Sequence, residues 1–173
     1  MGKVLSIAIL VVAAIAGGAM YYLQVYHFYR DVRLAAQGGE VEMRLTLASG
    51  DVIDLPARDF EGIDADSSPI RFRACFTTQA PQDAPLMPYP GAEPLTAPGW
   101  FECFDAKAIG AALEEGRARA YMGEADIQYG IDRVLAIYPD GRAYAWHQIN
   151  RCGEVVFDGQ PAPADCPEPP QGY

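Results

Sequence analysis

The sequence has few of the residues on which most catalytic centres depend. Histidine occurs twice in 173 residues, as His27 and His147, and neither belongs to an H-E-x-x-H pair. The chain has no G-x-S-x-G elbow, phosphate-binding glycine loop or G-x-G-x-x-G turn. We expect His27 to lie in a membrane-interface segment and His147 to be a hydrogen-bonded strand residue. The sequence therefore predicts no catalytic residue, no cofactor and no metal.

One acidic stretch, Asp64-Ala65-Asp66-Ser67-Ser68, begins like a calcium-binding loop. Pro69 stands where such a loop requires glycine, and Cys75 stands where it requires a bidentate glutamate. A capped acidic turn is the expected structure. Other carboxylates are numerous, but their spacing selects no pair for acid–base catalysis.

Basic residues are scarce, with 13 Lys and Arg against 23 Asp and Glu. Lys3 and Arg30 precede the first acidic residue, which leaves 11 basic and 23 acidic residues in 31–173, a net charge near −12. Nucleic-acid binding is excluded, because its affinity comes from Lys and Arg on phosphates. The same balance argues against electrostatic docking of the domain on anionic lipid. A basic partner is compatible with this charge.

Cysteine occurs four times and never as C-x-x-C, which excludes thioredoxin-type motifs and zinc knuckles. Two structural disulfides are expected in an oxidising compartment. Three pairings are possible, and we favour Cys75–Cys103 with Cys152–Cys166. The second bridge closes a loop of about 15 residues, which is worth roughly 3 kcal/mol in the chain-entropy model.

Charge is absent from Val4 to Leu23, a run of 20 residues. A helix of this length spans roughly 30 Å, the hydrocarbon core of a bilayer. Only Lys3 precedes the run, which favours a cytoplasmic N-terminus. Aromatic residues expected at the headgroup level follow it: Tyr21, Tyr22, Tyr26, Phe28 and Tyr29. The alternative is a signal peptide cleaved after Ala14-Ile15-Ala16.

Small residues form two overlapping small-xxx-small pairs within this run. They are Ala13, Ala14, Gly17 and Gly18, and such pairs let two helices in lipid approach closely. Helix pairing is one interpretation, and the general abundance of Gly and Ala in membrane helices is the other.

Beyond a polar stem at 30–40, alternation of apolar and polar residues predicts a strand hairpin over 41–47 and 52–55. Residues 56–68 are predicted to be an acidic connection with one helical turn at Asp59-Phe60-Glu61. Further strands are expected over 70–77, 118–122, 133–138 and 142–149, with an edge strand over 153–157. The strands 133–138 and 142–149 form the clearest hairpin, through the turn Pro139-Asp140-Gly141.

Six prolines between Pro81 and Pro98 predict a long loop or flap. A helix is predicted from Ala106 to Glu115, capped by Asp105 and ended by Gly116. The aromatic residues before it, Trp100, Phe101 and Phe104, are expected to hold it on the core.

The predicted fold class is α+β: a transmembrane helix, then one small domain with an antiparallel sheet of about five to six strands and one main helix. The predicted organisation is a membrane anchor over 1–29, the stem over 30–40, the domain over 41–159 and a Pro-rich tail over 160–173. The tail is expected to be ordered by its cysteine.

Several long sequence segments carry a resemblance that covers nearly the whole chain. They are G-G-A-M-Y-Y-L-Q-V-Y at 17–26, I-D-A-D-S-S-P-I-R-F-R-A-C-F-T-T at 63–78, W-F-E-C-F-D-A-K-A-I-G-A-A-L-E-E-G at 100–116, Y-G-I-D-R-V at 129–134 and A-W-H-Q-I-N-R-C-G-E-V-V-F-D-G at 145–159. In these segments the chain resembles small single-pass membrane proteins of alphaproteobacteria, which are classed as a domain of unknown function. The resemblance implies no activity and no site. Relatives sometimes carry a histidine kinase label, which we reject because the soluble part is too short for a phosphoacceptor hairpin and an ATP domain.

The functional expectation is a non-catalytic protein of the bacterial inner membrane with its domain in the periplasm. It would serve as an accessory or assembly factor of an envelope or membrane complex, with the bilayer and another membrane or envelope protein as partners. The alternatives are a ligand-binding or sensing module, with a cleft near Trp100 and Trp146 under the proline-rich flap, and an unrecognised enzyme.

Overall fold

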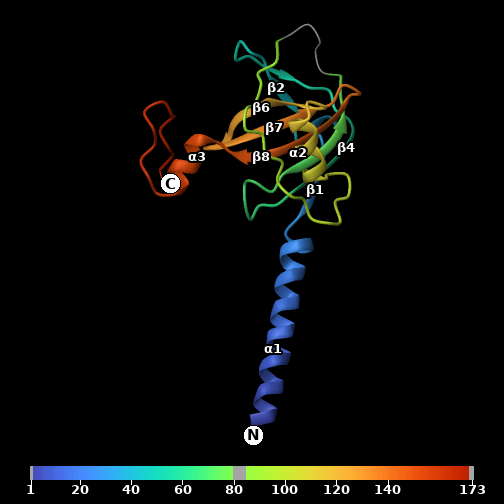
Figure 1. Cartoon of the computed structure of the whole chain (residues 1–173), viewed down its shortest axis with the longest axis vertical. Coiled ribbons are helices and arrows are strands. Elements are labelled where there is room, and N and C mark those ends of the chain that lie inside the picture. The colour runs from blue at the N-terminus through green and yellow to red at the C-terminus, as the bar shows by residue number, and fades with distance from the viewer. Residues whose placement is uncertain (1, 80–84, 172–173) are drawn as a thin grey trace.

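The computed structural model describes residues 2–79 and 85–171, in which one long helix carries a small α+β domain at its C-terminal end (Figure 1). Helix α1, Gly2–Tyr22, continues directly into a π-helical turn, η1, Leu23–His27. Residues Gly2–His27 are long and apolar enough to cross a membrane, and their most apolar window is not buried against the domain. A retained anchor and a signal sequence both meet this criterion.

Six antiparallel strands form the central sheet of the described residues, in the order β1-β4-β5-β8-β7-β6. A hairpin of β2 and β3 forms a second sheet. The strands are β1 Arg30–Val32, β2 Arg44–Thr46, β3 Val52–Asp54, β4 Arg58–Asp64, β5 Arg73–Thr77, β6 Arg119–Gln128, β7 Ile131–Ile137 and β8 Arg142–Ile149. The helices of the domain are the short 3-10 helix η2 Ala35–Gln37, α2 Ala106–Glu114 and α3 Arg151–Phe157. The predicted α+β class and both predicted hairpins are confirmed.

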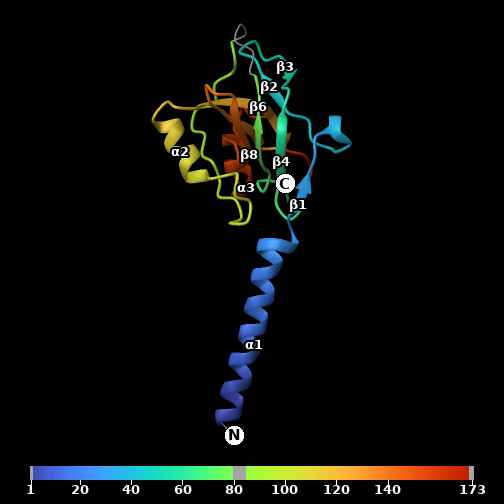
Figure 2. The same cartoon turned by 90° about the vertical axis from the view of Figure 1, so that its right-hand side faces the viewer.

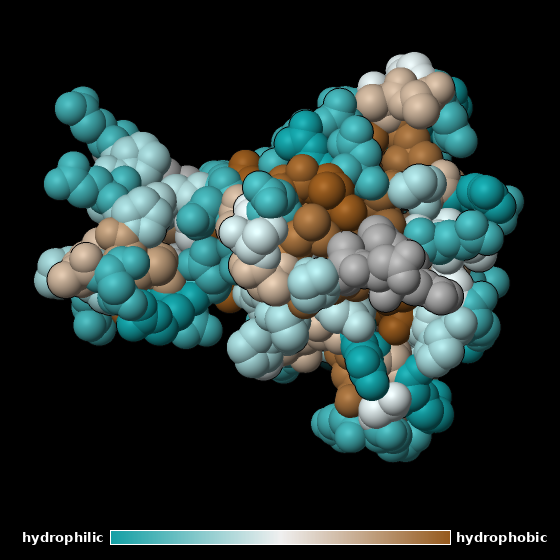
Figure 3. All heavy atoms as spheres, turned by 90° about the horizontal axis from the view of Figure 1, so that it is seen from above, coloured by the Kyte–Doolittle hydropathy of each residue, from teal (hydrophilic) through white to brown (hydrophobic). Residues whose placement is uncertain are grey.

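Both faces of the central sheet are covered, because its strands are apolar on both sides. On one face, Leu135 and Ala145 pack against Leu45 and the residues that follow β1. On the other, Trp146 and Val134 pack against α2 and the segment before it. Figure 2 shows α2 on one side of the sheet and the connection from β1 to β2 on the other. The end of the domain opposite α1 is mostly hydrophilic, with one apolar area near its centre (Figure 3).

The predicted connection with a helical turn at Asp59-Phe60-Glu61 is wrong, because these residues belong to β4. Pairing with β5 shifts register between Arg58 and Glu61, and Asp59 has a φ of +50°. A bulge of this kind breaks the alternation of side chains on which strand prediction depends.

The predicted edge strand at Gly153–Phe157 is also wrong, because these residues form most of α3. Asn150 caps this helix: its side-chain oxygen accepts hydrogen bonds from the amides of Cys152 and Gly153. Its side-chain amide in turn donates to buried Asp132, at 2.9 Å. This contact fixes the N-cap, so tertiary structure overrides the β propensity of the valines in the helix.

Two further boundaries differ from the prediction. The expected stem at 30–40 supplies β1, and Val32 and Leu34 are buried in the core. The short strand expected over 118–122 is the start of the ten-residue strand β6. The helix α2 agrees with its prediction, since Asp105 accepts from the Ala108 amide and Gly116 has a φ of +72°.

Candidate functional site

The domain is attached to the end of α1 by side-chain contacts as well as by the chain itself. Trp100 Nε1 donates a hydrogen bond to the Val25 carbonyl oxygen at 2.7 Å. Arg71 Nη1 donates to the Gln24 carbonyl oxygen at 3.4 Å. Both carbonyls lie in η1, where the last turn of a helix leaves acceptors without an intrahelical donor. Two distant parts of the domain therefore satisfy the backbone at the end of the helix.

Aromatic rings complete this contact. Tyr26 stacks on Trp100 with ring centroids 6.4 Å apart, and Tyr29 meets Trp100 edge to face at 5.9 Å. The guanidinium of Arg71 lies 5.4 Å from the centroid of the Tyr29 ring. Aromatic pairs and cation–π contacts of this kind each add roughly 0.5–1.5 kcal/mol. We call the set Gln24, Val25, Tyr26, Tyr29, Arg71 and Trp100 the joint.

The position of Trp100 is fixed from both sides along the chain. On one side the Phe101 amide donates to the Pro98 carbonyl, which closes a turn around Trp100. On the other side Phe101 and Phe104 are buried in the core, and Cys103 is bonded to Cys75 of β5. Phe101 and Phe104 hold the α2 region on the core as predicted. Trp100 is partly buried and packs against the same core cluster, and its ring also contacts η1.

Both predicted disulfide pairings are present. Cys75–Cys103 joins the centre of the sheet to the segment that carries Trp100, and Cys152–Cys166 joins α3 to the C-terminal tail. The described part of the chain leaves no cysteine free. Two disulfides favour an oxidising compartment.

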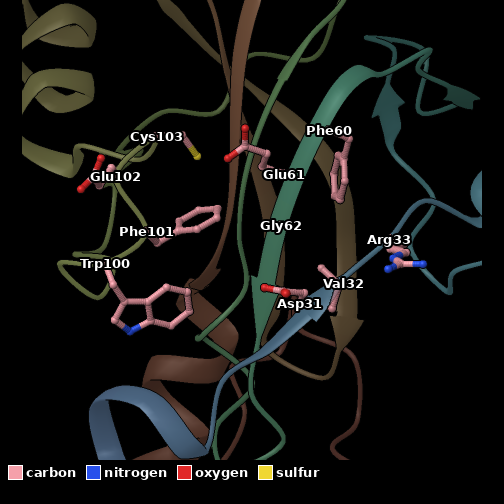
Figure 4. Close-up of a pocket in the computed structure, with 10 residues that line it drawn as sticks. All are labelled: Asp31, Val32, Arg33, Phe60, Glu61, Gly62, Trp100, Phe101, Glu102 and Cys103. Atoms are coloured by element: carbon pink, nitrogen blue, oxygen red, sulfur yellow. The ribbon is translucent and has the colours of Figure 1, made fainter.

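A cleft of about 490 Å³, which we call the edge cleft, opens beside the joint, between strands β1 and β4 and the segment 100–103. Figure 4 shows the side chains of Asp31 and Glu61 extending from β1 and β4 toward this segment, while Arg33 extends away from it. Neither carboxylate has an ion pair or a side-chain hydrogen bond among the described residues. With Trp100 at one end, this edge cleft has the chemistry to accept a cationic group.

His147 has the structural role that the sequence predicts. Its Nδ1 lies 2.8 Å from the Pro69 carbonyl oxygen, its Nε2 accepts from Arg133 Nε at 3.2 Å, and its ring stacks on Phe72. Burial, aided by the positive charge of Arg133, lowers the pKa of His147 to about 3. The ring is therefore neutral at physiological pH, donating to Pro69 and accepting from Arg133. This bond also supports the loop that carries Arg71.

Buried Arg73 is satisfied in a similar way. Its guanidinium donates to the carbonyl oxygens of Leu95 at 2.7 Å and Ile70 at 2.8 Å. Burial lowers the pKa of Arg73 to about 10, so it keeps its charge at physiological pH. These bonds tie the proline-rich segment to the sheet just ahead of Trp100.

The predicted long loop is present over the described residues 85–98, but it does not cover a cleft near Trp146. Residues 85–98 lie along the domain surface, with Met87 and Tyr89 bonded to β6 and Gly91 bonded to Gln148. Trp146 is fully buried and lines no cleft. The edge cleft lies on the far side of Trp100, between β1, β4 and the bridged segment. Residues 81–84 of the predicted flap lie outside the described residues.

The remaining predicted site residues lie on α1 and just after it. Tyr21, Tyr22 and Phe28 are exposed, and Tyr26 and Tyr29 belong to the joint. On the helix a Cβ added at Gly17 or Gly18 would meet nothing within 4 Å, so this face is open. A shallow hollow of about 390 Å³ lies on α1 and shares one residue with the predicted pairing set, since it is lined by Ala8, Ile9, Val12, Ala13 and Ala16.

The fold and the joint together define a class: a small α+β domain fixed on one N-terminal apolar helix that is able to span a membrane. The chain belongs to the family of unknown function DUF6446, whose model matches residues 42–167. The match begins after β1 and covers the disulfide-linked domain. No curated protein and no solved structure shows significant similarity to the chain.

Sequence reasoning missed the joint. It placed Tyr26 and Tyr29 near the membrane and Trp100 near the core, but 75 residues separate Val25 from Trp100. No local pattern signals a contact over that distance. The edge cleft was missed for the same reason, because β1 and β4 were predicted to be stem and connection.

Proposed function

We propose that this protein is a non-catalytic, single-pass protein of the bacterial inner membrane, with its N-terminus in the cytoplasm and its domain in the periplasm. It acts as an accessory or assembly factor of an envelope or membrane complex. The observation that carries the proposal is the joint, in which Trp100 and Arg71 hold the backbone of η1. A domain that needed only to be kept near a membrane would require no more than a flexible linker. Here the domain has a set orientation on its anchor.

A set orientation supports an assembly role because it presents the edge cleft at a defined height beside the membrane. The cleft opens next to the joint, so a neighbouring membrane protein meets Asp31 and Glu61 in a fixed position. Helix α1 supplies a second contact surface, since none of its residues is buried against the rest of the chain.

Crosslinking in the membrane, followed by purification in mild detergent, tests this proposal. We expect the full chain to be recovered with one or a few defined membrane or envelope proteins. The proposal is contradicted if the protein runs alone at every detergent strength after crosslinking.

Variants of α1 identify which helix face takes part. Gly17→Leu with Gly18→Leu fills the predicted pairing face, and Ala8→Leu with Ala16→Leu fills the shallow hollow with a similar increase in volume. We expect the glycine variant to lose association in detergent and the alanine variant to keep it. If the alanine variant loses association and the glycine variant keeps it, the contact lies at the hollow and pairing through Gly17 and Gly18 is contradicted.

The edge cleft supports a second candidate function, a ligand-binding or sensing module. Its ligand would carry a positive charge, because Asp31 and Glu61 are unpaired and Trp100 offers an aromatic face. Thermal-shift measurements with small cationic molecules and with metal ions separate the two candidates. A saturable rise in melting temperature that is lost in Asp31→Asn with Glu61→Gln favours the ligand-binding module.

A further inference from the structure

The joint has a consequence for how the domain meets the bilayer. The apolar run ends at Leu23, the first residue of η1, and Val25 lies two residues further on. At 1.5 Å per residue, the Val25 carbonyl is about 3 Å beyond the end of the run. The headgroup layer on each side of the hydrocarbon core is about 5–7 Å thick. Val25 therefore lies within this layer whenever α1 spans the membrane.

Trp100 shares this level although it belongs to the domain. Its Nε1 is 2.7 Å from the Val25 carbonyl oxygen, and its ring is stacked on Tyr26. Tryptophan and tyrosine favour the headgroup layer, because their rings are apolar and carry one polar group. Trp100 thus extends in space the aromatic belt that the sequence shows only over residues 21–29.

Arg71 lies at the same level from a different segment. It bonds to the Gln24 carbonyl and covers the ring of Tyr29. The described part of the chain gives Arg71 no carboxylate partner, whereas Arg30 nearby is paired with Glu40. A guanidinium forms strong, forked hydrogen bonds with phosphate oxygens, which phospholipid headgroups provide.

We infer that Trp100 and Arg71 form a headgroup-binding surface, through which the domain rests on the phospholipid bilayer. The contact needs no basic patch, and on zwitterionic phospholipid, which has no net charge, the net negative charge of the domain does not oppose it. That charge keeps the rest of the domain away from anionic lipid. The inference rests on the proposed membrane anchoring and adds a lipid contact made by the domain itself.

Depth-dependent quenching of tryptophan fluorescence tests this inference on the full chain in phosphatidylcholine vesicles. One set of vesicles carries a nitroxide quencher on the headgroup, and another carries it at the end of the acyl chain. The chain has two tryptophans, and Trp146 is fully buried in the core. We expect the headgroup quencher to reduce the emission and the acyl-chain quencher to have little effect. Trp100→Phe should lose the headgroup quenching, because only Trp146 remains.

Arginine variants with a matched control test the second residue. Arg71→Gln removes the charge at the joint. Arg58→Gln, the control, removes an exposed charge at the first residue of β4. We expect headgroup quenching of Trp100 to decrease in Arg71→Gln and to stay unchanged in Arg58→Gln. Equal quenching in the two variants would overturn the role of Arg71.

Flotation of the same vesicles distinguishes failure of the lipid contact from failure of the membrane anchor. A chain that floats with the vesicles while Trp100 escapes the headgroup quencher overturns the lipid contact and leaves the anchor in place. Quenching that is strongest from the acyl-chain position overturns it as well. A chain that fails to float overturns the anchor and the lipid contact together.

Discussion

The two disulfides connect regions that differ in burial: one holds a segment packed on the core, and the other holds the exposed C-terminal tail. Cys75–Cys103 starts from a buried residue of the central strand β5 and holds the segment that carries Trp100. Cys152–Cys166 starts from the short peripheral helix α3 and holds the tail, none of whose described residues from 160 to 171 is buried. Tyr129 donates a hydrogen bond to the Pro167 carbonyl oxygen of that tail, and Arg151 donates to Asp165.

This difference decides what each bridge contributes. A disulfide stabilises a fold by restricting the unfolded chain, provided that the folded chain stays ordered without the bridge. The segment before α2 meets this condition because Phe101 and Phe104 are buried. The tail does not meet this condition. Without the Cys152–Cys166 bridge it would become disordered in the folded protein, and the conformational entropy that it regains would stabilise that folded state. The first bridge therefore supports the joint, and the second orders only the C-terminus.

The largest expected effect comes from removing the central bridge. Cys75→Ala with Cys103→Ala opens a loop with a sequence separation of 28. The free energy of unfolding should fall by about 3–4 kcal/mol in the chain-entropy model. Urea denaturation in detergent micelles measures it. A loss below about 1 kcal/mol would show that the two bridges do not differ as described.

The second largest loss of stability is expected where α3 packs on the domain, a contact that does not depend on the Cys152–Cys166 disulfide. Gly130 and Gly153 pack so closely that a Cβ on Gly153 would lie 2.4 Å from the Gly130 carbonyl oxygen. Because this neighbour is backbone, Gly153→Ala should destabilise the protein by about 2–3 kcal/mol. Gly110→Ala on α2, where a Cβ would meet nothing within 4 Å, is the control. Similar unfolding free energies for the two variants would contradict this account of α3.

Acid should weaken the side of the domain that bears the joint. His147 has an ordinary pKa of 6.5 and a folded-state pKa of about 3. Below pH 6.5 the unfolded chain binds a proton that the folded chain does not, so stability falls as the pH is lowered. Between pH 7.5 and 5 the expected loss is about 2 kcal/mol. His147→Gln should be less stable at pH 7.5 but should lose this pH dependence, and an unchanged slope would argue against a neutral, buried ring.

The smallest effect is expected from the peripheral bridge. Cys152→Ala with Cys166→Ala should lower the free energy of unfolding by less than about 1 kcal/mol, because the released tail offsets the loss. The tail itself should become sensitive to proteases, as mass spectrometry of short digests would show. A drop as large as that of the central pair would mean that the tail is ordered by more than its cysteine.

The sequence predicts those features that depend on local patterns. The apolar run, the helix α2 with Asp105 as its cap and the hairpin of β7 and β8 are all found in the structure. The cysteine pairing that we favoured among three is also found, although Cys75 and Cys103 are 28 residues apart. Features that depend on distant contacts were not predictable. The bulge at Asp59 interrupts the alternation of side chains, so β4 was not predicted. The hydrogen bond from Asn150 to Asp132 fixes the N-cap of α3, where the sequence predicts a strand.

The candidate site belongs to the second kind. Its aromatic half, Tyr26 and Tyr29, is visible in the sequence as part of the belt after the apolar run. Its other half is supplied by Arg71 and Trp100, which the sheet and the central disulfide bring to the end of α1. No periodicity or spacing relates these residues to the helix, so only the folded domain shows the joint.

The central claim is that the joint fixes the domain on its anchor. Electron–electron double resonance in nanodiscs tests it most directly, with spin labels on Ala8→Cys in α1 and Glu114→Cys at the end of α2. We predict one narrow distance distribution for the otherwise unaltered chain and a broad one when Trp100→Ala and Arg71→Ala are added. Distributions of equal width in the two proteins would contradict a fixed joint.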